Sequence, residues 1–274
     1  MIRNLEITVL IDNVAAEPLA SEWGLSILVK ADDKMILLDT GASGLFSQNA
    51  EALGIDLAKV DTGVLSHAHY DHADGMNTFF SLNHSAPFLL REGSCENCFG
   101  IKDGELRYIG IRRGVLNMYS ARIQYVSGVY EICGGIWLVP HRKTDYSAIA
   151  LRNDLYTIDR EKRLPDDFAH EQSLVIETDR GLFVFNSCSH TGMTNILKDI
   201  SDYLGRRDVF AYVGGLHLYK MTDAELEALS AEIKSTSVEH IFTGHCTGDH
   251  AFSFLKERLG ERIEQFSAGF RYSF

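Results

Sequence analysis

The sequence predicts an α/β protein that folds as a four-layer αββα sandwich. Its 274 residues divide into two halves of similar order, each with β-rich segments first and helical segments after them. Apolar runs at residues 5–11, 26–30 and 34–38 have strand character, and the acidic pair at 32–33 is typical of a hairpin turn. Helices would cover the outer face of each sheet, and the two inner faces would bury each other.

The remaining elements follow from apolar periodicity and from turn residues. In the first half we expect a helix near 44–53, a strand at 62–65, a helix at 76–82 and a strand at 87–90. In the second half we expect strands at 173–178 and 182–186, a helix within 194–204, a strand at 209–213, a helix after the cap-like residues 222–225, a strand at 238–242 and a helix from about 249 to 259. No linker rich in Pro, Gly or Ser interrupts this order, so residues 1–274 are predicted to form a single domain.

Composition narrows the class of protein. The formal charge is 26 − 38 = −12, which argues against a nucleic-acid partner. The first six residues contain no apolar signal core, and no stretch approaches the roughly 18 apolar residues of a membrane helix. We therefore expect a cytoplasmic protein without a membrane partner.

Five cysteines, an odd number, favour free thiols over disulfides. The oligomeric state is left open, with a homo-oligomer among the alternatives.

The segment from residue 64 to 75 carries the strongest functional signal. His67, His69, Asp71 and His72 crowd together directly after a strand-like run. Alternate residues of an extended segment point the same way, so His67 and His69 can bind one metal ion. Asp71 and His72 lie where the chain turns toward a helix, and we expect them to bind a second ion. Imidazole and carboxylate ligands suit Zn, Fe or Mn, and zinc is the first expectation.

Three strands of the second half each end in a loop with a histidine. These are His190, His217 and His245. Because such strand ends converge on one rim of a sheet, all three can approach the 67–72 cluster. We expect His245 to join the second ion and His217 to have a catalytic or substrate-binding role. Cys188 and Cys246 are expected to be small buried packing residues rather than thiolate ligands.

The pattern His-x-His-x-Asp-His at 67–72 resembles the signature of the metallo-β-lactamase superfamily, whose metal-dependent hydrolases share the αββα sandwich. The resemblance extends over nearly the whole chain, with the segment 37–41 upstream and the histidine-bearing strand ends downstream. Segments 186–192, 214–218 and 243–248 resemble one branch, which contains the dihydropterin-methyl-ribofuranosylaminobenzene phosphate synthases. In this superfamily the stretch corresponding to about 91–166 is a variable insertion that faces the substrate.

The resemblance also bears on the remaining ligands. Most members use a histidine after one hairpin strand and an aspartate after the next, but the segment 188–190 of this chain contains no aspartate. We expect His190 to complete the first ion site. His170 is the rival ligand, because many members place their third histidine before the hairpin. Asp39, at the end of an apolar strand, is expected to accept a hydrogen bond from a ligand imidazole or its loop, with helix capping or a turn as the alternative.

By this resemblance the chain is a metal-dependent hydrolase that uses two divalent ions on a small-molecule substrate, either phosphorylated or ester-like. Asp71 would orient or deprotonate the attacking water, and His217 would protonate the leaving group. The synthase branch implies a transferase instead, in which an aminobenzene ribofuranosyl phosphate unit condenses with a dihydropterin diphosphate and diphosphate leaves. A metal-dependent sensor or an oxygen-binding di-iron module is the third alternative.

Overall fold

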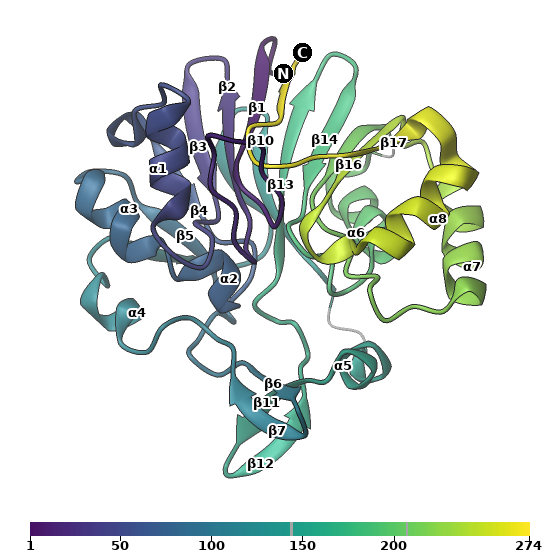
Figure 1. The fold of residues 1–274 in the computed structure, drawn as a ribbon. Coiled ribbons are helices and arrows are strands. Elements are labelled where there is room, and N and C mark those ends of the chain that lie inside the picture. Colours follow the sequence, from purple (N-terminus) through teal and green to yellow (C-terminus); the bar gives the residue numbers. More distant parts are fainter. Residues whose placement is uncertain (143–144, 207) are drawn as a thin grey trace.

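The computed structural model describes residues 1–142, 145–206 and 208–274. Within these residues, two large sheets stand next to each other at the centre, and helices cover the outer face of each (Figure 1). This arrangement confirms the predicted αββα sandwich.

The first sheet contains the N-terminal strands and ends with the last strand of the chain. Its spatial order is β18 (Arg271–Ser273), β1 (Leu5–Ile11), β2 (Ser26–Ala31), β3 (Lys34–Leu38), β4 (Thr62–Val64), β5 (Phe88–Arg91) and β8 (Ile123–Val126). Strands β1 to β3 pair antiparallel, with the predicted hairpin between β2 and β3, and β3, β4, β5 and β8 are parallel.

The second sheet repeats this mixture of antiparallel and parallel pairs. Its spatial order is β17 (Ile263–Gln265), β16 (His240–Thr243), β15 (Val209–Val213), β14 (Gly181–Phe185), β13 (Gln172–Thr178), β10 (Ile136–Pro140) and β9 (Tyr130–Cys133). Strands β14 to β17 are parallel, whereas β13 and β14 form the predicted hairpin.

Helices form the two outer layers. The first sheet is covered by α1 (Leu45–Ala52), α2 (Tyr70–Ala73), α3 (Met76–Leu82) and α4 (Val115–Met118), and the second by α6 (Met193–Leu204), α7 (Asp223–Lys234) and α8 (Asp249–Leu259). Single 3-10 turns lie at η1 (Leu57–Lys59), η2 (His245–Thr247) and η3 (Gly260–Arg262). Helix α7 begins after Thr222, which forms a reciprocal capping box with Glu225. None of the helices in the described ranges is long and apolar enough to cross a membrane.

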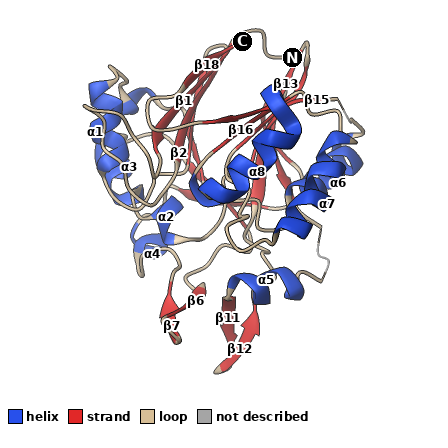
Figure 2. Ribbon diagram, turned by 45° about the vertical axis from the view of Figure 1, so that its right-hand side comes forward, coloured by secondary structure: helices blue, strands red, loops and turns tan. Residues whose placement is uncertain are grey.

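A small third sheet lies below the sandwich. It consists of β12 (Lys162–Pro165), β11 (Leu155–Asp159), β6 (Phe99–Lys102) and β7 (Glu105–Tyr108), beside helix α5 (Ser147–Asn153). Figure 2 shows these elements apart from both helical layers. They fall in the stretch of about 91–166 predicted as an insertion. The division into one domain with an insertion stays a prediction.

Strand β14 explains why many strands of this chain are continuous apolar runs. Phe183 and Phe185 pack into the core between the two sheets, whereas Leu182 and Val184 pack under the helices of the second sheet. Successive side chains of a strand point to opposite faces, and here both faces are buried. Burying one such side chain contributes about 1.5–3 kcal/mol, so both layers stabilise this strand.

The parallel strands bring their following loops to one edge of the sandwich. In the first sheet Asp39 follows β3 and His67 follows β4. In the second, His190, His217 and His245 follow β14, β15 and β16. The carboxyl ends of parallel strands face the same way, so residues far apart in sequence meet at this edge.

Candidate metal centre

Three imidazoles form a first group of metal-ligating atoms. The ring centroids of His67, His69 and His190 are 4.7–4.8 Å apart, and one nitrogen of each lies within 4.8 Å of the others. Nε2 of His67, Nε2 of His69 and both ring nitrogens of His190 are buried without a hydrogen-bond partner. Burial, followed by neighbouring imidazoles, lowers the pKa of His67 and of His190 well below the ordinary value. Neutral rings with free lone pairs are the form that binds a metal ion.

Asp71, His72 and His245 form a second, adjacent group. Nε2 of His72 lies 3.2 Å from Nε2 of His245, which lies 3.5 Å from Oδ2 of Asp71. The remaining distance, from His72 Nε2 to Asp71 Oδ2, is 3.9 Å. Burial alone would raise the pKa of Asp71, but His72 and His245 hold it well below its usual range, so the carboxylate stays ionised.

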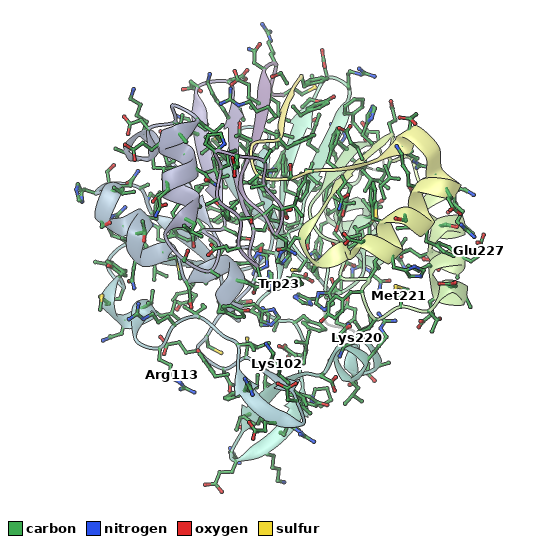
Figure 3. All side chains as sticks on the ribbon, in the orientation of Figure 1. Trp23, Lys102, Arg113, Lys220, Met221 and Glu227 are labelled. Carbon is green, nitrogen blue, oxygen red and sulfur yellow. The ribbon has the colours of Figure 1, made fainter. Side chains whose placement is uncertain are left out.

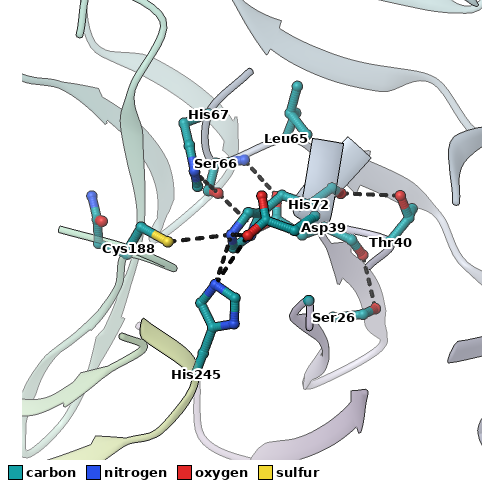
Figure 4. Close-up of polar contacts among 12 residues, drawn as sticks. Ser26, Asp39, Thr40, Leu65, Ser66, His67, His72, Cys188 and His245 are labelled. Carbon is teal, nitrogen blue, oxygen red and sulfur yellow. Dashed lines mark hydrogen bonds and ion pairs between the residues drawn. The ribbon is translucent and has the colours of Figure 1, made fainter. Parts of the chain in front are cut away.

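Asp39 sets the tautomers of one ligand in each group (Figure 4). Its Oδ2 accepts hydrogen bonds from the Ser66 hydroxyl at 2.6 Å and from Nδ1 of His72 at 2.8 Å. Because the Ser66 proton is used on Asp39, the Ser66 oxygen can accept from Nδ1 of His67, 2.8 Å away. Both rings then carry their proton on Nδ1 and keep the Nε2 lone pair for an ion. The supporting role of Asp39 toward a metal ligand stays a prediction.

His245 is held from the first half of the chain. Oδ1 of Asn13 accepts from the backbone N–H of Gly24 and lies 3.1 Å from Nδ1 of His245, so the other ring nitrogen, Nε2, faces His72 and Asp71. The Asp12 carboxylate accepts from the backbone N–H of His245 at 2.9 Å. Burial raises the pKa of Asp12 to about 6.

Glu171 fixes the loop that carries His190. Its carboxylate accepts from the backbone N–H of His190 at 2.7 Å and from the backbone and hydroxyl of Thr191 at 3.1 and 2.8 Å. These contacts bind the loop after β14 without using the His190 ring. Both ring nitrogens therefore stay available to an ion or a substrate.

His170 has a different geometry from the three histidines of the first group. Its Nδ1 accepts the backbone N–H of Ala68 at 3.1 Å, so its proton lies on Nε2 and is directed at Asp166 and Cys98, 3.2 and 3.6 Å away. A ring protonated on Nε2 and held through Nδ1 has no lone pair for an ion. His170 nevertheless forms another group of possible ligand atoms with His69, Cys98 and Asp166, so the choice of His190 over His170 stays a prediction.

His217 lies beside the first group. Its ring centroid is 4.3 Å from that of His190, and both of its nitrogens lack a partner. Its backbone has a left-handed φ of 51°, and φ is 60° at Asp39, 54° at Ser189 and 49° at His245. Non-glycine residues rarely adopt this conformation, and such residues cluster at functional sites.

Comparisons with known proteins identify the family of this chain. A solved structure described as a metal-dependent hydrolase of the β-lactamase superfamily is 31% identical to this chain, covers 98% of both chains and has a TM-score of 0.83. The chain belongs to the metallo-β-lactamase superfamily. The family model of the metallo-β-lactamase superfamily matches residues 24–118. A diphosphatase structure with 14% identity and a TM-score of 0.56, covering 100% of this chain and 98% of its own, shares the fold alone.

A curated relative is a 7,8-dihydropterin-6-methyl-4-(β-D-ribofuranosyl)-aminobenzene-5′-phosphate synthase of Methanocaldococcus jannaschii. It is 27% identical over 97% of this chain and 95% of its own length. An uncharacterised protein of the same organism is 26% identical over 92% of this chain and 94% of its own. Metallo-β-lactamase superfamily proteins typically bind divalent ions, and the buried, unpartnered Nε2 atoms of His67 and His69 fit such a group.

Apart from Asp39, the residues that contact the histidine loops were not predicted from the sequence. In the sequence, Asp12 and Asn13 follow a strand and are as typical of a turn as of a functional site. Glu171 is next to His170 but belongs to no recognisable motif. Cys95 and Cys98 form a Cys-x-x-Cys pair. Cys95 is exposed, whereas Cys98 is buried and its Sγ lies 3.6 Å from Nε2 of His170. All five cysteines are free, as predicted. The only signal for the first two was their place at the end of a strand.

Proposed function

We propose that this chain is a cytoplasmic metal-dependent hydrolase that activates water against a small phosphorylated or ester-like substrate at a site for two divalent ions. The observation that supports it is the pair of adjacent groups, His67, His69 and His190 beside Asp71, His72 and His245. Divalent ions held there would lower the pKa of a coordinated water and polarise the oxygen of the attacked group. Zinc suits these imidazole and carboxylate donors best, with Fe and Mn as alternatives.

The chain supplies the proton transfers and the orientation of the reacting groups. The ionised Asp71 carboxylate accepts a hydrogen bond from the attacking water and orients it. His217 has no partner at either ring nitrogen, so it can donate a proton to the leaving group. Asp39 keeps His67 and His72 in the tautomer that binds an ion.

A cavity beside the centre offers room for the substrate. It has a volume of about 280 Å³ and reaches His190 and His217 between α5, α6 and α7. Its wall is largely apolar, with Met193, Leu216 and Met221 among its lining residues. This lining favours a substrate with an apolar or ring-shaped part next to the group that is hydrolysed.

Two exposed aromatic rings flank the histidines at the surface. The Trp23 ring centroid is 5.1 Å from that of His245, and the Tyr219 centroid is 4.9 Å from that of His217. Both side chains are about half exposed, at 49% and 48%. Figure 3 places Trp23 at the lower edge of the sheets and Met221 farther to the right, near α7. We propose that these rings contact a planar part of the substrate.

A transferase of the synthase type is the second candidate. It is supported by the 27% identity to the Methanocaldococcus jannaschii synthase, which extends over nearly the full length of both chains. The same ligand groups would then bind the diphosphate of the substrate, and the aromatic rings at Trp23 and Tyr219 would contact its ring systems.

Metal analysis joined to a substrate screen tests the proposal. We expect about two equivalents of Zn, Fe or Mn in the purified wild type and fewer in His67→Ala and His190→Ala. Wild type should then hydrolyse a phosphodiester, phosphomonoester or lactone, and His217→Gln should retain its metal but lose most of the activity. Release of diphosphate only when a pterin diphosphate and an aminobenzene acceptor are both present would favour the transferase. A wild type that binds less than one equivalent after reconstitution would refute both candidates.

A further inference from the structure

Helix α5 brings two consecutive polar residues to the cavity beside the metal centre. Arg152 and Asn153 are the last two residues of α5 (Ser147–Asn153), and they line this cavity together with His190 and His217. The helix belongs to the predicted insertion and lies below α6 and α7 (Figures 1 and 2). The end of α5 therefore borders the same space as two histidines of the candidate metal centre.

One polar atom of each residue is buried without a hydrogen-bond partner in the described part of the chain. These atoms are Nε of Arg152 and Oδ1 of Asn153. Asn153 is only 4% exposed, and its Nδ2 donates to the Ile149 carbonyl at 3.1 Å, which leaves the oxygen as the unpaired atom. Burying a polar atom without a partner is unfavourable. Two such atoms on a cavity wall indicate a ligand that would pair with them.

The two atoms differ in the partner that they require. Nε of Arg152 carries a hydrogen and donates, whereas Oδ1 of Asn153 accepts. A ligand that pairs with both must offer an acceptor and a donor close together. A neutral amide does so, because its carbonyl oxygen accepts and its N–H donates. A ketone or an ester has no N–H, and an ammonium group has no acceptor.

The charges around the cavity argue against an anionic ligand group. Nη1 of Arg152 lies 3.3 Å from Oε1 of Glu225, so a carboxylate already balances the guanidinium charge. Glu232 also lines the cavity. Among the described residues, the charged side chains of the lining are therefore one cation and two carboxylates. A carboxylate or phosphate on the ligand would be repelled by this excess negative charge, whereas a neutral amide would not.

We propose that Arg152 and Asn153 form a subsite for a neutral amide group of the substrate. Nε of Arg152 donates to the amide oxygen, and Oδ1 of Asn153 accepts from the amide N–H. The inference rests on the proposed function, which assigns this cavity to the substrate. The apolar side chains of Met193, Leu216 and Met221 contact the part of the substrate that carries the amide. Such a subsite rejects analogues without the amide, because its own buried polar atoms would then stay unpaired.

Titration of the full chain with three small probes of similar shape tests the subsite. Benzamide carries the amide, acetophenone has a methyl group in place of the amide nitrogen, and benzoate carries a charge. Two-dimensional NMR of the Arg152 Nε–H and of the Asn153 side-chain amide follows binding at these two residues. We expect wild type to bind benzamide about tenfold more tightly than acetophenone, and also more tightly than benzoate, with and without added zinc.

Variants assign the preference to the two side chains. Asn153→Leu should bind benzamide and acetophenone equally, because the acceptor for the N–H is gone. Arg152→Met should weaken both ligands, because both carbonyls lose their donor. Lys220→Gln is the matched control: Nζ of Lys220 lies 2.7 Å from Oδ2 of Asp154, so this ion pair also holds the end of α5. It should keep wild-type affinities, and circular dichroism checks that every variant is folded.

The outcomes separate this inference from the proposed function. Equal affinities of wild type for benzamide and acetophenone, or no binding of benzamide, would overturn the amide subsite, and so would tightest binding of benzoate at these signals. A preference that persists in Asn153→Leu or disappears in Lys220→Gln would also overturn it. Metal analysis of the same samples reports on the two-ion site. A preference for benzamide in a chain that binds no zinc would support the subsite and refute the hydrolase.

Discussion

The substitution Asp39→Asn should weaken metal binding while leaving every proposed ligand in place. Oδ1 of Asp39 accepts the Ser66 backbone N–H at 2.7 Å, so this atom must remain an oxygen in the variant. The new amide nitrogen then faces the Ser66 hydroxyl and Nδ1 of His72, at the positions now 2.6 and 2.8 Å away. An amide nitrogen donates, so both partners must become acceptors.

The consequence reaches a ligand of each ion. His72 would carry its proton on Nε2, and Ser66 would turn its hydroxyl toward Nδ1 of His67, which moves that proton to Nε2 as well. Losing an orienting partner typically costs 10–100-fold in metal affinity, which is about 1.4–2.7 kcal/mol per ion. Replacing charge-assisted hydrogen bonds by neutral ones should also lower the free energy of unfolding of the metal-free protein by about 1–2 kcal/mol.

Competition with a chromophoric chelator measures the Kd of both ions. Asp103→Asn is the matched control, because Asp103 also has a left-handed φ, of 55°, and its side chain is 76% exposed in the β6–β7 turn. We expect wild-type Kd values for Asp103→Asn and two weakened ions for Asp39→Asn. Wild-type affinity for both ions in folded Asp39→Asn would show that the tautomers do not depend on Asp39.

Three further predictions follow from the same site. His190→Ala should lose about one of two metal equivalents, and His170→Asn should keep both, because of these two residues only His190 has ring nitrogens without a hydrogen-bond partner. Elemental analysis that showed the reverse would make His170 the ligand. In the metal-free protein, burial raises the pKa of Asp12 from 3.8 to about 6. The folded state therefore binds this proton more tightly than the unfolded state does. The free energy of unfolding should fall by about 3 kcal/mol as the pH rises from about 4 to 6. Urea unfolding of Asp12→Asn should show a flatter profile in that window, and an unchanged slope would assign the effect to another group. His217→Gln should lower kcat about 10²–10⁴-fold with unchanged bound metal, and a loss of metal instead would make His217 a ligand.

Local sequence patterns predicted most elements of the sandwich. The acidic turn at residues 32–33, the capping residues at Thr222 and the apolar run of β14 act through near neighbours, so they could be read without the fold. The elements that were missed are short. Strands β11 and β12 form a local hairpin without a strong turn signal, whereas others pair only with distant partners. Strand β18, for example, forms by pairing with β1 at the opposite end of the chain.

The sequence by itself predicted the strand-to-helix cluster at His67 to His72, because spacing within six residues is a property of the local chain. The sequence also predicted His190 and His245 as distant partners of this cluster, but only the tertiary structure showed how they are brought to it and which further residues orient them. Parallel strands deliver His190 and His245 to the same edge, while Asp12, Asn13 and Glu171 support them through contacts that span up to 233 positions. The tautomers of His67, His72 and His170 also depend on the tertiary structure. A buried ring nitrogen cannot exchange hydrogen bonds with water, so it carries a proton when its neighbour is an acceptor and none when its neighbour is a donor.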